Sequence, residues 1–116
     1  MRHRNKGKIL DRKVGPRQAM VKNLVQSLVL YEKIKTTGAR AKVLRSQVER
    51  CITLGKKPTL ANRRLLLQRL PTENAVKKIL EVLSPRYLER KGGYTRIIKL
   101  GTRSGDRAEM VQIEFI

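Results

Sequence analysis

A chain of 116 residues with 40% hydrophobic content is long enough for one domain with a single modest core. Its 28 lysines and arginines against 9 acidic residues give a formal net charge of +19, so the expected partner is a polyanion: nucleic acid, an anionic membrane surface or an acidic protein. The sequence has no apolar run of about 18 residues and only one cysteine, which excludes a membrane-spanning helix, an internal disulfide and a cysteine-based metal cluster, and fits a reducing compartment.

Residues 1–14 are predicted to form an extended basic arm that precedes a single α/β domain over residues 15–116. The segment from Arg2 to Lys8 shows no apolar periodicity, and residues 1–22 hold eight lysines and arginines but one acid. This density favours a segment that stays extended in solution and orders on a phosphate surface, with a solvated tail as the plain alternative.

The domain is predicted to begin with an amphipathic helix near Pro16, since proline is favoured in a first turn. Its apolar residues recur at three- and four-residue spacing, and the expected buried stripe comprises Met20, Val21, Leu24, Val25, Leu28 and Tyr31. Residues 33–37 alternate and are β-branched, which is typical of a strand. Thr37 or Gly38 is the expected cap of a second helix that ends near Leu54. Its expected core residues are Ala41, Leu44, Val48, Cys51 and Ile52.

Two shorter helices are expected next. The third spans about residues 59–70, and its expected inward residues are Leu60, Ala61, Leu65 and, as a further candidate, Leu66. Thr72 is the expected cap of the fourth, which spans about residues 73–83 and should end before Pro85. The expected buried residues of this fourth helix are Val76, Ile79, Leu80 and Leu83.

Two strand-like runs close the chain, over residues 94–100 and 110–116, and a polar loop over residues 101–107 joins them as a hairpin. In the second run Val111, Ile113 and Phe115 are expected on one face. The order of elements predicts a two-layer α/β (α+β) fold in which helices cover a small three-stranded mixed sheet.

The residues that catalysis needs are missing from the sequence. His3 is the one histidine, so neither a catalytic triad nor a zinc site can be assembled. The acidic residues are scattered, mostly beside Lys or Arg, and Gly92-Gly93 precedes a strand, whereas a phosphate-binding P-loop opens a helix. We therefore expect no enzyme, no metal, no cofactor and no small-molecule substrate.

Basic clusters point instead to phosphate contacts. Aromatic residues make up only 3% of the chain, too few for a platform on which single-stranded bases stack. Binding through phosphates and shape is therefore favoured, and Tyr94 is more readily explained by packing on the sheet than by stacking. The candidate RNA-binding residues are Arg2, His3, Arg4, Lys6, Lys8, Arg12, Lys13, Arg17, Lys22, Lys35, Arg40, Arg63, Arg64, Arg86, Arg90, Lys91, Gly92, Gly93, Tyr94, Arg96, Arg103 and Arg107.

Several motifs also resemble a known family. They are Met1-Arg2-His3-Arg4, Ile34-Lys35-Thr36-Thr37, Ala61-Asn62-Arg63-Arg64, Pro85-Arg86-Tyr87, Gly92-Gly93-Tyr94-Thr95-Arg96-Ile97 and Gly105-Asp106. In this order, along the whole chain, the sequence resembles ribosomal protein L17 of the bacterial large subunit. It departs from the family pattern at Val14-Gly15-Pro16, where the family usually has a serine-rich turn that ends in histidine.

The resemblance implies a structural protein that binds large-subunit ribosomal RNA beside neighbouring large-subunit proteins, near the peptide exit tunnel. It implies a cytoplasmic ribosome, of a bacterium or of an organelle with bacterial-type ribosomes. The RNA contacts that it implies are Arg2, His3, Arg4, Arg12, Arg63, Arg64 and Arg96.

Two other classes of function remain as alternatives. A sequence-specific DNA-binding regulator needs a recognition helix with exposed base-reading side chains, whereas each helix here is expected to place one face on the core. A cationic membrane-surface protein needs Trp or Phe on the apolar face of a basic helix, and the first helix has neither. Folded RNA is therefore the favoured polyanion, and no membrane partner is expected.

Overall fold

A computed structural model of the chain describes residues 14–116. The predicted basic arm lies outside the described residues, apart from its last residue, and so do the candidate contacts Arg2, His3, Arg4, Lys6, Lys8, Arg12 and Lys13. The elements in chain order are α1 (Val14–Tyr31), β1 (Lys33–Thr37), α2 (Gly38–Gly55), α3 (Leu60–Arg69), α4 (Glu73–Lys78), the π-helical turn η1 (Ile79–Leu83), α5 (Ser84–Arg86), β2 (Thr95–Thr102) and β3 (Glu109–Phe115).

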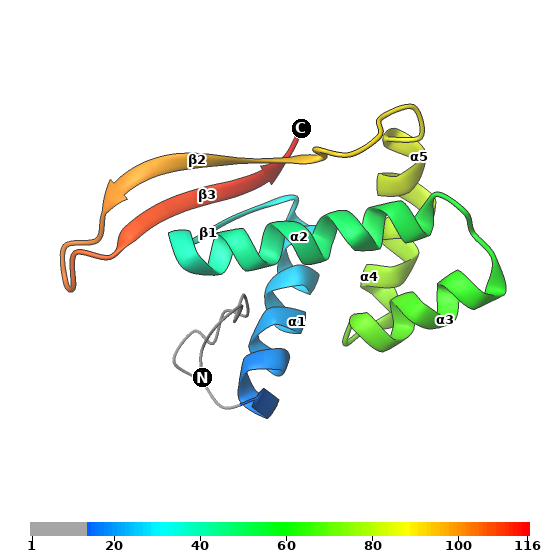
Figure 1. The fold of residues 1–116 in the computed structure, drawn as a ribbon, viewed down its shortest axis with the longest axis horizontal. Coiled ribbons are helices and arrows are strands. Elements are labelled where there is room, and N and C mark those ends of the chain that lie inside the picture. Colours follow the sequence, from blue (N-terminus) through cyan, green and yellow to red (C-terminus); the bar gives the residue numbers. More distant parts are fainter. Residues whose placement is uncertain (1–13) are drawn as a thin grey trace, which may run out of the picture.

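The domain has two layers, as predicted, with helices packed on one face of the sheet (Figure 1). α2 lies along the sheet and contacts all three strands. The strand order is β1-β3-β2, and both pairings are antiparallel. The prediction of a mixed sheet is therefore wrong. β1 and β2 run in the same direction, but β3 lies between them, so no parallel pair forms.

The predicted helix near Pro16 is confirmed, and its buried residues are Val25, Leu28 and Val29. The prediction that Tyr31 belongs to this buried stripe is wrong, because its side chain is 73% exposed. The next residue, Glu32, has a positive φ of 64° and turns the chain from α1 into β1. Tyr31 therefore lies at the very end of the helix on its exposed side, although Leu28 and Val29 of the same last turn are buried.

α2 is the best-predicted helix, since all five of its expected core residues are buried. Its last residue, Gly55, packs against α5, and a Cβ there would lie 2.3 Å from the Oγ atom of Ser84. The Ser84 hydroxyl donates a hydrogen bond of 2.9 Å to the Ile52 carbonyl. Glycine at this position therefore lets two helices approach closely, and the buried serine finds its partner across the contact.

α3 presents a different face to the core from the one predicted. Leu66 is fully buried and the following Leu70 nearly so, whereas Leu60, Ala61 and Leu65 are exposed. The helix has only ten residues and contacts α2 and α4 along a single narrow face, so most of its leucines stay in solvent. Thr59 caps its first turn and accepts a hydrogen bond from the Asn62 backbone at 3.2 Å, whereas Thr37 and Thr72 precede their helices without a cap hydrogen bond of this kind.

Pro85 does not end the fourth helix, contrary to the prediction. The π-helical turn η1 ends with the Ser84 N–H bonded to the Ile79 carbonyl, five residues earlier. A new helical turn, α5, then begins at Ser84, so Pro85 occupies a first-turn position where its missing N–H is not required. Ile79 and Leu83 are buried, as predicted.

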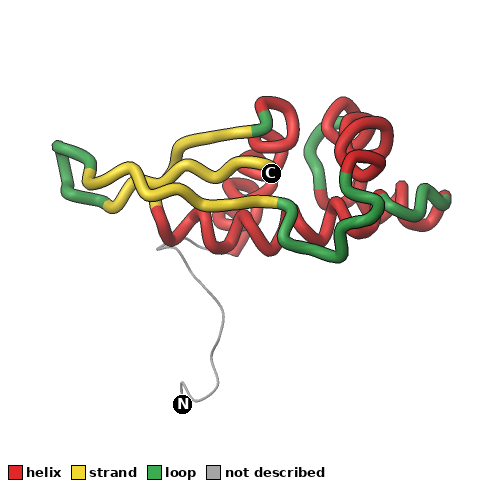
Figure 2. Tube along the Cα trace, turned by 90° about the horizontal axis from the view of Figure 1, so that it is seen from above, coloured by secondary structure: helices red, strands yellow, loops and turns green. Residues whose placement is uncertain are grey.

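The predicted hairpin of β2 and β3 is confirmed, and it extends beyond the helices at one end of the molecule (Figure 2). Val111, Ile113 and Phe115 of β3 are buried on the helix-facing side. The other strands supply Ile34 and Ile97, which both pair with Ile113 across the sheet. No helix within residues 14–116 is long and apolar enough to cross a lipid bilayer.

Candidate nucleic-acid interface

Four of the predicted RNA-binding arginines are engaged in ion pairs within the domain. These pairs are Arg63 with Glu73, Arg86 with Glu32, Arg96 with Glu114 and Arg103 with Asp106. A guanidinium beside a carboxylate keeps its charge, but the pair as a whole is neutral. These four arginines therefore add less to the positive surface potential than their number in the sequence suggests.

Arg86 is held by an acidic and an aromatic neighbour. It donates a hydrogen bond to Glu32, and its guanidinium lies over the Tyr87 ring, 5.9 Å from the ring centre. The Arg86 hydrogen bond lowers the pKa of the Glu32 carboxyl, which also forms an ion pair of 3.5 Å with Lys78. Arg86 therefore joins α5 to the turn between α1 and β1.

The hairpin tip, residues 103–108, is held by a local network. The Arg103 Nε atom donates to Asp106 at 2.9 Å, and the Asp106 carboxylate also accepts from the Ala108 backbone at 3.2 Å. The hydrogen bond from Arg103 is the main reason that the pKa of Asp106 lies far below its usual range. Arg107, with a positive φ of 57°, is exposed beside this network. Among the described residues, Arg107 is therefore outside an ion pair and available to a phosphate, whereas Arg103 is paired with Asp106.

The double glycine forms a turn with positive φ at both residues, 141° at Gly92 and 61° at Gly93. No atom lies within 4 Å of a Cβ placed at either position, so the turn needs glycine for its backbone conformation and not for close packing. The Arg90 side chain donates to the Gly93 carbonyl at 3.1 Å, and Lys56 donates to the Arg90 carbonyl. Arg90 and Lys91 are exposed around this turn.

The burial of Tyr94 speaks against base stacking at this residue. Its side chain is only 2% exposed, its ring lies 5.4 Å from the ring of Tyr87, and the Lys56 ammonium covers it at 4.6 Å. A ring enclosed in this way has no free face on which a base could stack. The buried ring favours the alternative interpretation, that Tyr94 packs within the domain.

A basic groove lies between α1, α2 and the end of α3, with a volume of about 770 Å³. Its cations are Arg17, Lys22, Lys42, Arg50 and Arg69. Arg17 and Lys22 were expected to bind RNA, and the structure places them here, whereas Lys42, Arg50 and Arg69 were not anticipated from the sequence. One sequence signal could have found two of them, because Lys42, Ser46 and Arg50 recur every four residues along one side of α2.

Within residues 14–116, no negative charge balances the cations of the basic groove. No acidic side chain lines it, and none of its five cations forms an ion pair with an acid of residues 14–116. Burial raises the pKa of the Cys51 thiol, at the floor, to about 11, although the charge of Arg69 opposes this shift. The thiol is therefore neutral at physiological pH, and the groove keeps its full positive charge.

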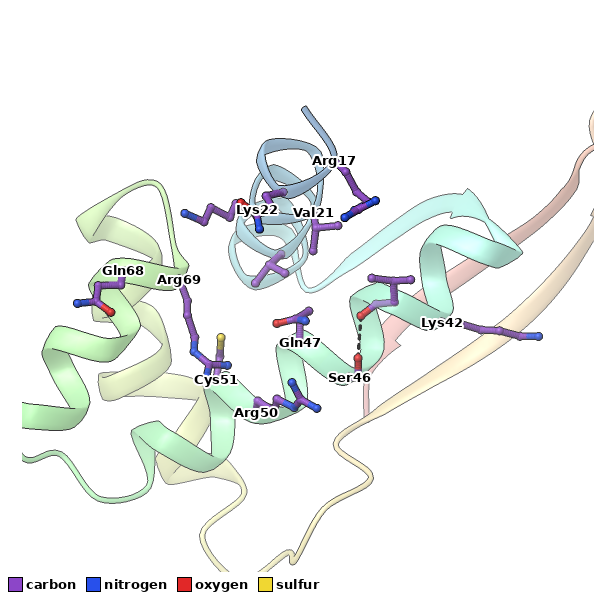
Figure 3. A pocket seen from close by; sticks show the side chains of 13 residues that line it. Arg17, Val21, Lys22, Lys42, Ser46, Gln47, Arg50, Cys51, Gln68 and Arg69 are labelled. Carbon is purple, nitrogen blue, oxygen red and sulfur yellow. Dashed lines mark hydrogen bonds between the residues drawn. The ribbon is translucent and has the colours of Figure 1, made fainter. Parts of the chain in front are cut away.

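The close view in Figure 3 shows how the walls of the groove are arranged. Gln47 and Cys51 extend from α2 toward α1, Arg69 reaches from α3 toward Cys51, and Lys42 points away from α1. The floor is apolar, with Val21, Val25, Val43 and Cys51. The groove thus combines a charged rim with a floor that can contact an uncharged surface.

The remaining predicted contacts are not brought together at one place. Lys35 is exposed on β1, Arg40 is half-buried in the first turn of α2, and Arg64 is exposed on α3. None of the three is ion-paired with an acid of the described part of the chain. The positive surface is therefore distributed over several elements, and the basic groove is one concave part of it.

Fold and charge place the molecule among small, strongly basic α+β proteins whose antiparallel sheet is covered by helices on one face. The profile of the ribosomal protein L17 family matches residues 20–116, and the chain belongs to this family. Large ribosomal subunit protein bL17 of Bdellovibrio bacteriovorus is 54% identical to it over 114 residues. That alignment covers 98% of this chain and 63% of the relative, so the chain spans less than two thirds of the relative's length.

Proposed function

We propose that this protein is a non-enzymatic structural constituent of the large ribosomal subunit, where it binds and stabilises folded ribosomal RNA beside neighbouring ribosomal proteins. Family membership supports the assignment to the subunit. By the resemblance of its sequence motifs, its place is near the peptide exit tunnel. The ribosome is that of the bacterial cytoplasm or of an organelle with bacterial-type ribosomes.

The observation that carries RNA binding is the basic groove, in which residues 14–116 place five cations and no acid. Each phosphate that a lysine or arginine neutralises releases condensed counterions, which favours binding and makes the affinity depend on salt. Cations that are already paired with carboxylates contribute less to this release. The groove, the exposed cations around the double glycine and Arg107 at the hairpin tip are therefore the surfaces on which RNA contacts are expected.

The test is association with large subunits, followed by RNA crosslinking of the bound protein. We expect the protein to sediment with large subunits and to crosslink to ribosomal RNA, and to bind duplex DNA more weakly than ribosomal RNA at the same salt. Its affinity for RNA should fall steeply between roughly 50 and 500 mM salt. An affinity that stays constant over this range, or a failure to sediment with the subunit, would refute the proposal.

A further inference from the structure

We propose that the basic groove holds one unpaired nucleotide of RNA, with its base on the apolar floor and its flanking phosphates on the cationic rim. This inference rests on the proposed function and makes it more specific, because it names the part of an RNA that the groove accepts. Three features of the groove support it: the unbalanced charge of the rim, the chemistry of the floor, and the size.

The rim is suited to phosphates. Its five cations come from three helices, so they surround the groove from different sides, and no acid of the described residues competes for them. A second hollow, of about 490 Å³, lies along α1, and its lining is uncharged: Pro16, Ala19, Met20, Asn23, Leu24 and Ser27. One helix thus borders a charged hollow and an uncharged one, and only the charged one can attract a phosphate group.

The floor is suited to a base. The half-buried Val21 and Val43 offer apolar surface, which a phosphate does not need but the flat face of a base can cover. Three glutamines, Gln18, Gln47 and Gln68, also line the groove, and amides can both donate and accept hydrogen bonds at base edges. The half-buried Gln47 makes no side-chain hydrogen bond within residues 14–116, so its amide is free for such a partner.

The size favours a single nucleotide over a duplex. A hollow of about 770 Å³ is within the range that holds small organic ligands of nucleotide size. Proteins recognise RNA mostly at unpaired bases, which they hold between aromatic rings or against arginine guanidinium planes. No tyrosine or phenylalanine lines this groove, so the guanidinium groups of Arg17, Arg50 and Arg69 are the planar groups available for stacking.

The experiment compares two RNA stem-loops. One has a single bulged nucleotide whose base is the fluorescent 2-aminopurine, and the other is identical but has no bulge. The full chain is titrated against both at equal salt. We expect roughly tenfold tighter binding to the bulged RNA, the effect of one stacking contact or well-made hydrogen bond, and a change in 2-aminopurine emission on binding.

Matched variants separate the groove from general charge. The double variant R50Q/R69Q should lose the preference for the bulge, whereas K57Q/K77Q, which removes two exposed charges elsewhere, should keep it. Gln47→Ala should reduce the preference without a change of charge, whereas Asn23→Ala, in the uncharged hollow, should not. Thermal unfolding of each variant checks its fold, and Gln47→Ala tests the site even if R50Q/R69Q is unstable.

Equal affinity of the wild type for the two RNAs, or equal losses in the two double variants, would overturn the single-nucleotide site while leaving RNA binding intact. If the wild type binds neither stem-loop nor ribosomal RNA at low salt, the proposed function fails and the groove site fails with it. The two failures are therefore distinguishable.

Discussion

The basic groove and the hairpin tip carry the same kind of side chain in opposite electrostatic environments. At the tip, Arg103 is paired with Asp106 and helps to hold the loop. In the groove, Arg50 and Arg69 lie among other cations, without an acid of residues 14–116 as partner. An arginine in a strongly basic protein can therefore stabilise the fold or bind a partner, depending on whether an acidic side chain lies beside it.

The difference also indicates how readily each region can change partners. Exposed ion pairs contribute little to stability, because water and salt already screen both charges. Arg103 can therefore leave Asp106 for a phosphate at small cost. The groove cations give up no acidic partner of residues 14–116 when RNA binds, so they should make the larger contribution to affinity.

The largest effect on RNA affinity is expected when an acid is added to the basic groove, so that its cations are paired as Arg103 is at the hairpin tip. Gln47→Glu places a carboxylate among the five cations, where it can pair with them and repel phosphate. We expect RNA affinity to fall about tenfold or more at roughly 100 mM salt, with a shallower salt dependence. Binding titrations with the bulged stem-loop at several salt concentrations measure both quantities.

The control for this change is Asn23→Glu, which alters the net charge equally but lies in the uncharged hollow of α1. It should weaken binding by no more than a few-fold. Equal losses in the two variants would mean that only total charge matters and that the groove has no special role.

A smaller effect on RNA affinity is expected when the acid at the hairpin tip is removed, so that Arg103 is left unpaired like the groove cations. Asp106→Asn removes the partner of Arg103, so the arginine becomes available to phosphate. RNA affinity should rise a few-fold, and the slope of log affinity against log salt should steepen by about one for the freed arginine. The melting temperature should fall slightly, because Asp106 also accepts from the Ala108 backbone.

Glu109→Gln is the matched control, since Glu109 is an exposed acid on the same hairpin and forms no ion pair with a cation of residues 14–116. It changes the net charge as Asp106→Asn does, but it frees no arginine. If it raises the affinity as much, the pairing of Arg103 is irrelevant to RNA binding.

The sequence predicts the elements well where periodicity is strong. All five expected core residues of α2 are buried, and β3 alternates as expected, because long amphipathic runs have only one way to place their apolar side in a core. α3 is predicted worse. It is short and has leucines on several sides. The spacing of its residues therefore does not predict the buried face, which is determined by tertiary contacts with α2 and α4.

The groove and the ion pairs depend on contacts between distant parts of the chain. Arg86 and Glu32 are 54 residues apart, and nothing near either residue in the sequence indicates the other. The groove likewise needs α1, α2 and α3 in place before Lys22, Arg50 and Arg69 face one hollow. Composition predicts a basic surface, but only the fold separates paired from unpaired cations.

A pH-dependent effect on stability is expected at the ion pair between Glu32 and Arg86. The pKa of Glu32 is lowered below its usual 4.5, chiefly by the hydrogen bond from Arg86, so the ionised carboxylate is favoured in the folded state. Its stabilising contribution is present above pH 4.5 and is lost as the pH falls through the lower pKa of the folded state. The melting temperature of Glu32→Gln should therefore be a few degrees below wild type at pH 7, and the gap should close in acid.

Glu81→Gln serves as the control for this titration, because Glu81 is exposed and forms no ion pair with a cation of residues 14–116. Its melting temperature should follow wild type from pH 7 to pH 3. A gap for Glu32→Gln that persists unchanged in acid would show that the substitution acts through packing and not through charge.

The smallest effect is expected at Tyr94, and it tests where a base can bind. Tyr94→Phe removes a hydroxyl that lies 3.4 Å from the Thr53 hydroxyl but keeps the buried ring. The loss in stability should be under about 1 kcal/mol, since the contact is long and partly exposed. RNA affinity and the preference for the bulged stem-loop should not change, because the ring is enclosed by Tyr87 and Lys56. A clear loss of that preference, measured in the same titration, would place base recognition at the glycine turn instead of the groove.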